Sequence, residues 1–418
     1  MKMTKYKLSE LVEVTRGASL SGQFYAEEGK LVRLTLGNFN MNGGGFKENT
    51  SKTDLYFTGT VRDEFILNEG DIITPLTEQS LGLLGTTARI PESGKYIQSQ
   101  DVALVRCKKG LLDPNFCYYL ISSSIVRQQL SAAAQQTKIR HTSPEKIKDC
   151  TVWVPDFDVQ KNIGRILTDI DNKIAINRRI NDNLEAMAKQ LYDYWFVQFD
   201  FPNEEGKPYK SNGGAMVWNE KLKRDIPQGW SDCILGDICD MYQPKTLGLN
   251  DLSEDSEYKV YGANGIIGHY SSYNHENSEI AMACRGNSCG TINRTSPKSW
   301  ITGNAMVIKF RNKEIHNEYI KQALKYANVK GAISGSGQPQ LTRENLSLLK
   351  MTQPNYAILE AFSKKVAAIV AMELEIEEQN DNLTKQRDEL LPLLMNGQAS
   401  VNYHLSASTS ISFDISVL

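Results

Sequence analysis

Two acidic residues and a lysine near the middle of the chain have the types that metal-dependent nucleases use. Pro155-Asp156 is followed by Asp171-Asn172-Lys173, which fits a Pro-Asp…Asp-x-Lys pattern. Such a site needs carboxylates that converge on one Mg²⁺ from a sheet. The triplet instead falls inside a long helical pattern, flanked by the apolar Ile170 and Ile174. We therefore expect a solvated helix face here, and the nuclease interpretation is the weaker one.

Other residues that could carry chemistry do not form a recognisable site in the sequence. No Gly-x-x-x-x-Gly-Lys-Ser/Thr loop for phosphate occurs, and the glycine turn at 262–268 is not followed by the βαβ unit of a dinucleotide site. The seven cysteines form no Cys-x-x-Cys pair, and there are only five histidines. Zinc binding is therefore not expected, and the thiols are interpreted as buried or incidental. The sequence predicts a non-catalytic chain without metal or cofactor.

The helical pattern that contains Asp171 runs from Asp156 to Phe196 and is repeated from Tyr356 to Met395. Apolar residues in both copies recur with the 3.5-residue spacing of a coiled-coil seam. In the first copy they are Ile163, Leu167, Ile170, Ile174, Leu184, Ala188, Leu191 and Trp195, and in the second Val366, Ile369, Ile376, Leu383, Leu390 and Leu394. Neither helix can bury its apolar stripe alone. We expect the two to form an antiparallel coiled coil.

The two helical patterns belong to an internal duplication. Asn181-Asp182-Asn183-Leu184 recurs letter for letter as Asn380-Asp381-Asn382-Leu383. Asn181 and Asn380 both fall on the seam, where an asparagine costs stability and fixes the register of a coiled coil. The segment that begins at Leu235 echoes the one that begins at Leu8. The order is module, helix, module, helix.

This order divides the chain into five predicted parts. They are two mixed α/β modules (1–155 and 215–355), a first long helix with its connector (156–214), a second long helix (356–396) and a loosely held tail (397–418). Short β-rich runs broken by glycine predict the strands of each module. One helix is predicted over Asn115–Ala134 and its counterpart over Asn317–Ala327. The predicted fold is thus α/β (mixed α+β) modules in tandem, separated by a coiled coil.

Composition restricts the functional classes. Apolar residues make up 40% and charged residues 23% of the chain, which is ordinary for a soluble globular protein. The net charge is −2, but the modules carry a small basic excess and the long helices an acidic one. This distribution permits DNA binding by the modules. No apolar run is long enough to cross a membrane and the polar start has no signal-peptide core, so we expect a cytoplasmic protein.

Three further stretches carry a family resemblance. They are Leu191–Pro202 continuing to Gly206–Tyr209, Ile226–Trp230 leading into Leu235–Ile238, and Leu390–Gln398. Together with the duplicated helices, they resemble the specificity subunit of type I restriction-modification enzymes, over essentially the whole chain.

The resemblance implies a division of labour among subunits. The two modules would be target recognition domains that each read half of a split sequence in double-stranded DNA, with an unread spacer between the halves. The paired helices would separate the modules and dock methyltransferase subunits, two of them, within an assembly that includes restriction (translocase) subunits. S-adenosylmethionine, ATP and Mg²⁺ would be bound by those partners, and none by this chain.

Candidate DNA contacts are the loop residues whose side chains can bond to base edges or phosphates. In the first module they are Arg33, Asn38, Thr77, Gln79, Ser80, Lys138 and Arg140. In the second module they are Tyr261, Asn264, Arg285, Asn287, Ser288, Ser336, Gln338 and Gln340. For Arg285 two interpretations stay open, a DNA contact or a loop brace paired with Glu279 or another acid.

Two wider alternatives also stay open. The unlike loops of the two modules fit either two readers of different sequences or drift after duplication. A coiled-coil adaptor whose modules bind proteins, without DNA specificity, is the second functional hypothesis. A gel-shift assay with duplex DNA, with and without a methyltransferase partner, distinguishes the two functions.

Overall fold

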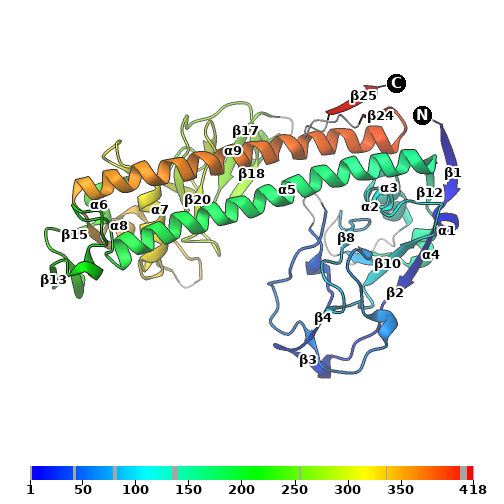
Figure 1. Ribbon diagram of the computed structural model, residues 1–418, viewed down its shortest axis with the longest axis horizontal. Coiled ribbons are helices and arrows are strands. Elements are labelled where there is room, and N and C mark those ends of the chain that lie inside the picture. Colours follow the sequence, from blue (N-terminus) through cyan, green and yellow to red (C-terminus); the bar gives the residue numbers. More distant parts are fainter. Residues whose placement is uncertain are drawn as a thin grey trace. The chain divides into compact units, whose positions relative to one another are not determined.

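The computed structural model describes residues 2–40, 44–78, 82–133, 140–253, 256–335, 337–404 and 412–417, with side chains as far as residue 399. The chain forms two compact units (Figure 1). Unit 1 comprises Met1–Ile176 with Asn380–Leu418, and unit 2 comprises Asn177–Gln379. Each unit therefore holds one α/β module, half of the first long helix and half of the second.

Unit 1 is built on an antiparallel four-stranded sheet with the order β2-β10-β6-β8. Its strands are β2 (Val12–Arg16), β10 (Val102–Cys107), β6 (Ile72–Pro75) and β8 (Ala88–Arg89). A second sheet has the order β3-β5-β4-β9, with strands Tyr25–Ala26, Tyr56–Phe57, Leu31–Arg33 and Tyr96–Ile97. Leu67, Ile73 and Leu104 lie in the buried cluster that joins the two sheets. The β-branched residues of these strands suit such a half-buried pleated surface.

Smaller elements complete the first module. They are the pairs β1 (Met3–Lys7) with β12 (Thr151–Pro155) and β7 (Thr77–Glu78) with β11 (Arg140–His141), and the helices α1 (Leu8–Leu11), α2 (Pro114–Ser122), α3 (Ser124–Ala133) and α4 (Pro144–Lys148). The Asp113 carboxylate accepts the Phe116 N–H at 3.0 Å and caps α2, as Asp-Pro predicts. The single helix predicted over Asn115–Ala134 is wrong. Ser123 is extended, with φ −65° and ψ 154°, and separates α2 from α3.

Unit 2 repeats this plan. Its four-stranded sheet has the order β16-β22-β19-β20, with strands Cys239–Tyr242, Ala305–Phe310, Ile280–Ala283 and Ile292–Arg294. A three-stranded sheet contains β18 (Gly265–Tyr270), β17 (Tyr258–Gly262) and β21 (Trp300–Ile301). The remaining elements are β13 (Met216–Asn219) with β14 (Arg224–Pro227), β15 (Ser231–Ile234) with β23 (Lys350–Gln353), and the helices α6 (Leu235–Ile238), α7 (Glu318–Tyr326) and α8 (Arg343–Ser347).

Strand order confirms the internal duplication. In both units the longest strand of the four-stranded sheet, β10 or β22, lies between two antiparallel neighbours. A parallel pair recurs as β4–β9 and β17–β21. In each module a strand just before the first short helix pairs with the last strand before the long helix, as β1–β12 and as β15–β23. The prediction of two α/β modules in tandem is therefore confirmed.

The long helices are α5 (Phe157–Tyr192), which continues as a π-helical turn at Asp193–Val197, and α9 (Tyr356–Met395). Within unit 1, the first half of α5 and the last half of α9 share one buried cluster that contains Ile163, Leu167 and Leu394. Within unit 2, Asn181 of α5 meets Glu373 of α9, while Trp195 meets Phe362 further along. As residue numbers rise along α5, those of the contacting residues on α9 fall, so the helices run antiparallel, as predicted.

The asparagine side chains of the long helices form only some of the hydrogen bonds available to them. The Asn181 side-chain amide donates to the Glu373 carbonyl oxygen at 3.2 Å, which fits its predicted register role. The side-chain carbonyl oxygens (Oδ1) of Asn181 and Asn380 are buried without a hydrogen-bond partner in the part of the chain described. Asn177, which the sequence analysis did not single out, has a buried amide nitrogen in the same state. All three therefore bury a polar atom without a partner among the described residues.

The stretch after α9 departs from the expected loose tail. Its backbone forms β24 (Ala399–His404) paired antiparallel with β25 (Ser412–Val417). Among the helices described, none is long and apolar enough to cross a membrane.

Candidate nucleic-acid interface

Five predicted DNA contacts of unit 2 lie on two loops that meet where β19 ends. The Gly286 N–H donates to the Pro339 carbonyl oxygen at 3.0 Å, and the Leu341 N–H donates to the Cys284 carbonyl oxygen at 3.0 Å. Between these bonds, Arg285 and Gln340 form an isolated antiparallel bridge. We call this the 285–340 bridge. It holds two loops that are far apart in sequence side by side.

Glycines give both loops their shape. Gly286 has φ 74° and Gly290 has φ 89°, a region that residues with a Cβ rarely adopt. The Gly290 N–H returns to the Ala283 carbonyl oxygen at 2.8 Å and closes the first loop. In the second loop, Ser334 and Gln340 exchange backbone hydrogen bonds of 2.9 and 2.8 Å. These backbone bonds hold the described parts of both loops without using their side chains.

The buried thiol of Cys284 supports the first loop. The Cys284 sulfur receives a hydrogen bond from the Gln243 amide at 3.0 Å and can donate one to the Asn304 carbonyl oxygen at 3.1 Å. The seven cysteines are free thiols, five of them buried, in agreement with the interpretation from sequence.

Side chains at the 285–340 bridge point away from this support. Arg285, Asn287, Gln338 and Gln340 are exposed, and Ser288 is half-buried. A guanidinium group offers five donors, and an amide offers donors and an acceptor together. These are the groups that can bond to the edges of guanine and adenine.

The loop-brace interpretation of Arg285 fails for its proposed partner. Glu279 is buried and forms its ion pair with Lys309, at 2.5 Å. Burial raises the pKa of Glu279, and the positive charge of Lys309 partly offsets that rise. Arg285 forms no ion pair with any acid among the residues described. The geometry favours a side chain free to meet a ligand.

Two further predicted contacts of unit 2, Tyr261 and Asn264, differ from each other. Tyr261 is buried, and its hydroxyl bonds to the hydroxyl and backbone N–H of Ser296, each at 3.0 Å. It therefore has a structural role in this structure. Asn264 is exposed in the turn between β17 and β18, next to Gly265 with φ 90°, and stays a predicted contact.

In unit 1 the corresponding loops are stiffened by a buried carboxylate. Glu78 accepts the backbone N–H groups of Gly82, Leu83 and Leu84 at 3.1, 2.9 and 3.0 Å. It also forms an ion pair with Arg140 at 3.1 Å, and Arg140 donates to Ser131 as well. The predicted contact Arg140 is thus a brace in this structure.

Three more predicted contacts of unit 1 are buried. The Arg33 guanidinium pairs with Asp54 at 3.1 Å and lies 3.8 Å from the centre of the Tyr25 ring. The Asn38 side chain accepts the Thr35 N–H at 2.8 Å and holds a turn. With exposed fractions of 7% for Arg33, 2% for Asn38 and 8% for Thr77, none can reach a base without rearrangement. The sequence analysis took them as loop residues open to DNA, and for Arg33 it could not see the partner Asp54, which lies 21 residues away.

The remaining predicted contacts fall outside the described residues. They are Gln79, Ser80, Lys138 and Ser336. One exposed residue of this region was missed by the sequence analysis. His141 follows Arg140 on β11. Its signal was the duplication, because the 199 residues that separate Asn181 from Asn380 also separate His141 from Gln340.

The nuclease-like pattern has a different use in the fold. The Asp171 carboxylate accepts the Tyr119 hydroxyl at 2.6 Å and pairs with Arg387 at 2.9 Å. In the part of the chain that the structure describes, no three His, Cys, Asp or Glu side chains gather in a way that could hold a metal ion. Asp171 therefore connects helices.

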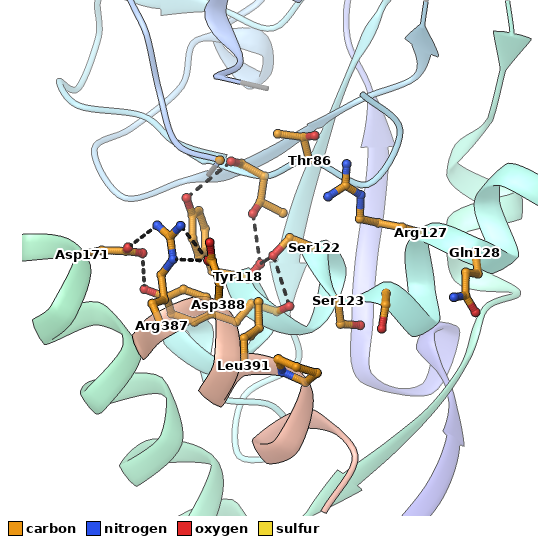
Figure 2. A pocket seen from close by; sticks show the side chains of 15 residues that line it. Thr86, Tyr118, Ser122, Ser123, Arg127, Gln128, Asp171, Arg387, Asp388 and Leu391 are labelled. Carbon is orange, nitrogen blue, oxygen red and sulfur yellow. Dashed lines mark hydrogen bonds and ion pairs between the residues drawn. The ribbon is translucent and has the colours of Figure 1, made fainter. Parts of the chain in front are cut away.

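The same residues border a cavity of about 540 Å³ in unit 1 (Figure 2). Figure 2 shows Arg387 between Asp171 and Asp388, with Tyr118 and Ser122 of α2 beside them. The charged side chains of the lining are two arginines, Arg127 and Arg387, and the two aspartates. Because these charges balance and the side chains bond to one another or to backbone, the cavity points to no ligand class.

Comparison with known sequences places these features in a family. The family described as "Type I restriction modification DNA specificity domain" matches residues 1–186 and 227–383, which is most of the chain. The HindI specificity subunit of Haemophilus influenzae is 21% identical and is covered over 81% of its length by 72% of this chain. The putative MjaX specificity subunit of Methanocaldococcus jannaschii is 23% identical, and the match covers 85% of its length and 84% of this chain.

Shorter and structural matches agree. The MjaIX specificity subunit of Methanocaldococcus jannaschii is 27% identical over 132 residues, which cover 31% of this chain and 28% of the relative. Among solved structures, the S subunit of the type I restriction-modification system from M. genitalium is similar with a TM-score of 0.59 and 18% identity. That alignment covers 94% of this chain and 96% of the other. At this identity the likeness establishes the fold.

Proposed function

Since this chain belongs to the family of type I restriction-modification DNA specificity subunits, we propose that it reads a bipartite DNA sequence for methyltransferase subunits that dock on it. Family membership itself supports DNA target recognition by a chain that is not the catalytic subunit. The proposal adds that each module reads one half of the target, with an unread spacer between the halves. It also adds that two methyltransferase subunits, and restriction subunits with them, supply the chemistry.

The observation that carries this proposal is the 285–340 bridge. Two loops from distant parts of the sequence are fixed together by backbone bonds at 3.0 Å, and they expose a guanidinium group beside several amides. Base edges in the major groove are read by these groups, and each good bidentate contact is worth about 1–3 kcal/mol of discrimination. Preorganised loops lose little freedom when they bind, which favours affinity.

Independent reading by the modules is supported by the duplication with unlike loops. The framework strands correspond, whereas Thr77-Glu78 stands in unit 1 where Arg285-Gly286 stands in unit 2. Two copies of one framework with different side chains are expected to select different half-sites.

Docking on the long helices is supported by apolar side chains that no packing covers. In unit 2, Ile180 and Met187 of α5 and Met372 of α9 are exposed. Exposed apolar patches mark protein contacts, and a subunit docked on these helices would bury the three side chains. We propose that methyltransferase subunits cover this part of the helices, that S-adenosylmethionine, ATP and Mg²⁺ are bound by partners, and that the assembly works in the cytoplasm.

The test uses the full chain together with its methyltransferase partner and a library of randomised duplexes. The wild-type complex is expected to select a motif with two specified halves. Replacing residues 1–155 with the matching module of a relative should change one half and leave the other. If both halves changed together, the modules would not read independently. If no sequence preference emerged from intact, folded complex, the protein-binding adaptor would be the better hypothesis.

A further inference from the structure

Backbone bonds give a residue-by-residue correspondence between the reading loops of the two units. In unit 2 the Leu341 N–H donates to the Cys284 carbonyl oxygen at 3.0 Å, and in unit 1 the Thr142 N–H donates to the Leu76 carbonyl oxygen at 2.8 Å. Sheet register agrees with this match. Ala283, the residue before Cys284, pairs with Ala305 of β22, and Pro75, the residue before Leu76, pairs with Val102 of β10.

The residues next to these bonds therefore occupy equivalent places. Arg285 bridges Gln340 in unit 2, and Thr77 pairs with His141 in unit 1. Residues directly opposite each other on antiparallel strands point their side chains to the same face. His141 is thus the counterpart of Gln340, and Thr77 is the counterpart of Arg285.

Exposure separates the two members of the unit 1 pair. Thr77 is buried, with 8% of its surface exposed, whereas His141 is exposed. The adjacent Arg140 is already engaged by Glu78 and Ser131. His141 has no hydrogen bond or ion pair with the described part of the chain. Of the two paired residues Thr77 and His141, the one whose side chain is open to a ligand is His141.

We propose that His141 is a specificity-determining residue of unit 1, which contacts the edge of a purine base in the position that Gln340 serves in unit 2. This inference rests on the proposed function and names a residue for it. A glutamine amide can form two hydrogen bonds to adenine at once, through N6 and N7. The two ring nitrogens of histidine point in different directions, so an imidazole forms one bond to a given base edge, such as guanine or adenine N7.

This difference in bonding predicts what exchanging the residues does. His141→Gln gives unit 1 a bidentate group, so one position of one half-site should gain a preference for adenine. Gln340→His removes the bidentate group from unit 2, so one position of the other half-site should become less selective. His141→Ala leaves no bonding group and should relax the same position that His141→Gln changes.

The experiment selects duplexes from a randomised library with the full chain and its methyltransferase partner, for wild type and each variant. For His141→Gln and Gln340→His, which gain and lose a bidentate group, the change at the affected position should be about 5- to 150-fold in base preference. Gln228→His is a matched control, since Gln228 is an exposed residue between β14 and β15. This control should leave both half-sites unchanged.

The outcomes separate this inference from the function on which it rests. A wild-type complex that selects no motif overturns the proposed function. A wild-type motif that is unchanged in both His141→Gln and His141→Ala overturns the role of His141 and leaves the function standing. Changes in both half-sites would also overturn it. Should a His141 variant lower Tm, Gln340→His tests the same correspondence from unit 2, where an unchanged motif contradicts it.

Discussion

Arg387 of α9 and Asp171 of α5 form an ion pair in unit 1, with 2.9 Å between Nη1 and Oδ1 (Figure 2). Because the same carboxylate accepts the Tyr119 hydroxyl at 2.6 Å, one acid joins α2 of the module to both long helices. Burial raises the pKa of Tyr119, and the negative charge of Asp171 adds to that rise. The phenol therefore stays protonated and remains a donor to Asp171.

Removing the cation from this junction should destabilise unit 1. In Arg387→Met the Asp171 carboxylate keeps Tyr119 but loses its charge partner while only 29% exposed. An uncompensated buried charge of this kind costs about 3–5 kcal/mol, and we expect about 3 kcal/mol because solvent reaches Asp171. Urea unfolding measures this change. Lys161→Ala, which breaks an exposed pair with Asp158, is the control and should cost less than about 1 kcal/mol. Equal losses in both variants would contradict the role of the junction.

Unit 2 makes the corresponding connection with Glu185 of α5. Its carboxylate bonds to Lys321, to Gln322 at 3.1 Å and to Lys325 at 2.5 Å, all on α7. Burial opposes the ionisation of Glu185, but the bonds and charges of Lys321 and Lys325 outweigh it and lower its pKa to about 2. A carboxylate in this state stabilises the fold while it is ionised.

The lowered pKa of Glu185 predicts a dependence of stability on pH. An acid whose pKa is lower in the folded state than in the unfolded state, where it is about 4.3, contributes stability above that unfolded value. The contribution is lost as the pH falls from about 4.3 through about 2. After solvent screening of the one-third exposed side chain, we expect about 1–2 kcal/mol. Glu185→Gln should therefore be less stable than wild type at about pH 6, and the difference should shrink at about pH 2.5.

Urea unfolding at both pH values measures this difference, with the exposed Glu205→Gln as the matched control. Glu205 pairs with Lys207 in the solvated connector and should show no comparable difference at either pH. A constant gap between Glu185→Gln and wild type across the range would contradict the proposed linkage.

Apolar periodicity and the internal duplication predicted most of the fold from the sequence. They did not predict which loop residues are buried. The 3.5-residue spacing located α9 at Tyr356–Met395 to the residue, because a helix seam depends on local spacing alone. The break at Ser123 was missed, since an extended serine between two helical turns leaves no periodic trace. Arg33 and Asp54 are far enough apart in sequence that no local pattern pairs them. Conversely, His141 was recognised only once the strand register matched it with Gln340, although the duplication already relates these two positions in the sequence.

Replacing the seam asparagine Asn181 by leucine should stabilise unit 2. The side-chain oxygen of Asn181 is buried without a partner in the described structure, and its side-chain nitrogen donates one hydrogen bond of 3.2 Å to Glu373. Leucine removes the unsatisfied group and buries additional apolar atoms, so we expect a gain of about 1 kcal/mol in the free energy of unfolding. Urea unfolding gives the value. A loss of similar size would show that the bond to Glu373 outweighs the buried oxygen.

The same variant tests whether asparagine fixes the helix register. A polar seam residue gives specificity at a cost in stability. If Asn181 has that role, Asn181→Leu complexes should select duplexes with more than one spacer length, whereas wild type selects one. Stabilisation with an unchanged single spacer would leave Asn181 without a register role.

Arg285→Ala tests the 285–340 bridge most directly. Because Arg285 is exposed and pairs with no acid among the residues described, its loss should leave Tm unchanged. If the guanidinium group makes a bidentate base contact, binding should weaken by about 1–3 kcal/mol and one position of one half-site should relax. If it touches only phosphate, binding should weaken evenly across sequences, and the salt dependence should become shallower by about one unit of slope.

Arg311→Ala is the control within the same sheet. Strand β22 runs antiparallel to β19, so the end of β22 next to Arg311 is the end away from Arg285. Arg311 is exposed and pairs with Asp240 at 3.0 Å. Its loss should cost less than about 1 kcal/mol of stability and should leave the selected motif unchanged. Unaltered affinity and an unaltered motif in Arg285→Ala would remove Arg285 from the interface. A fall in Tm together with lost binding would instead assign it to bracing the loop.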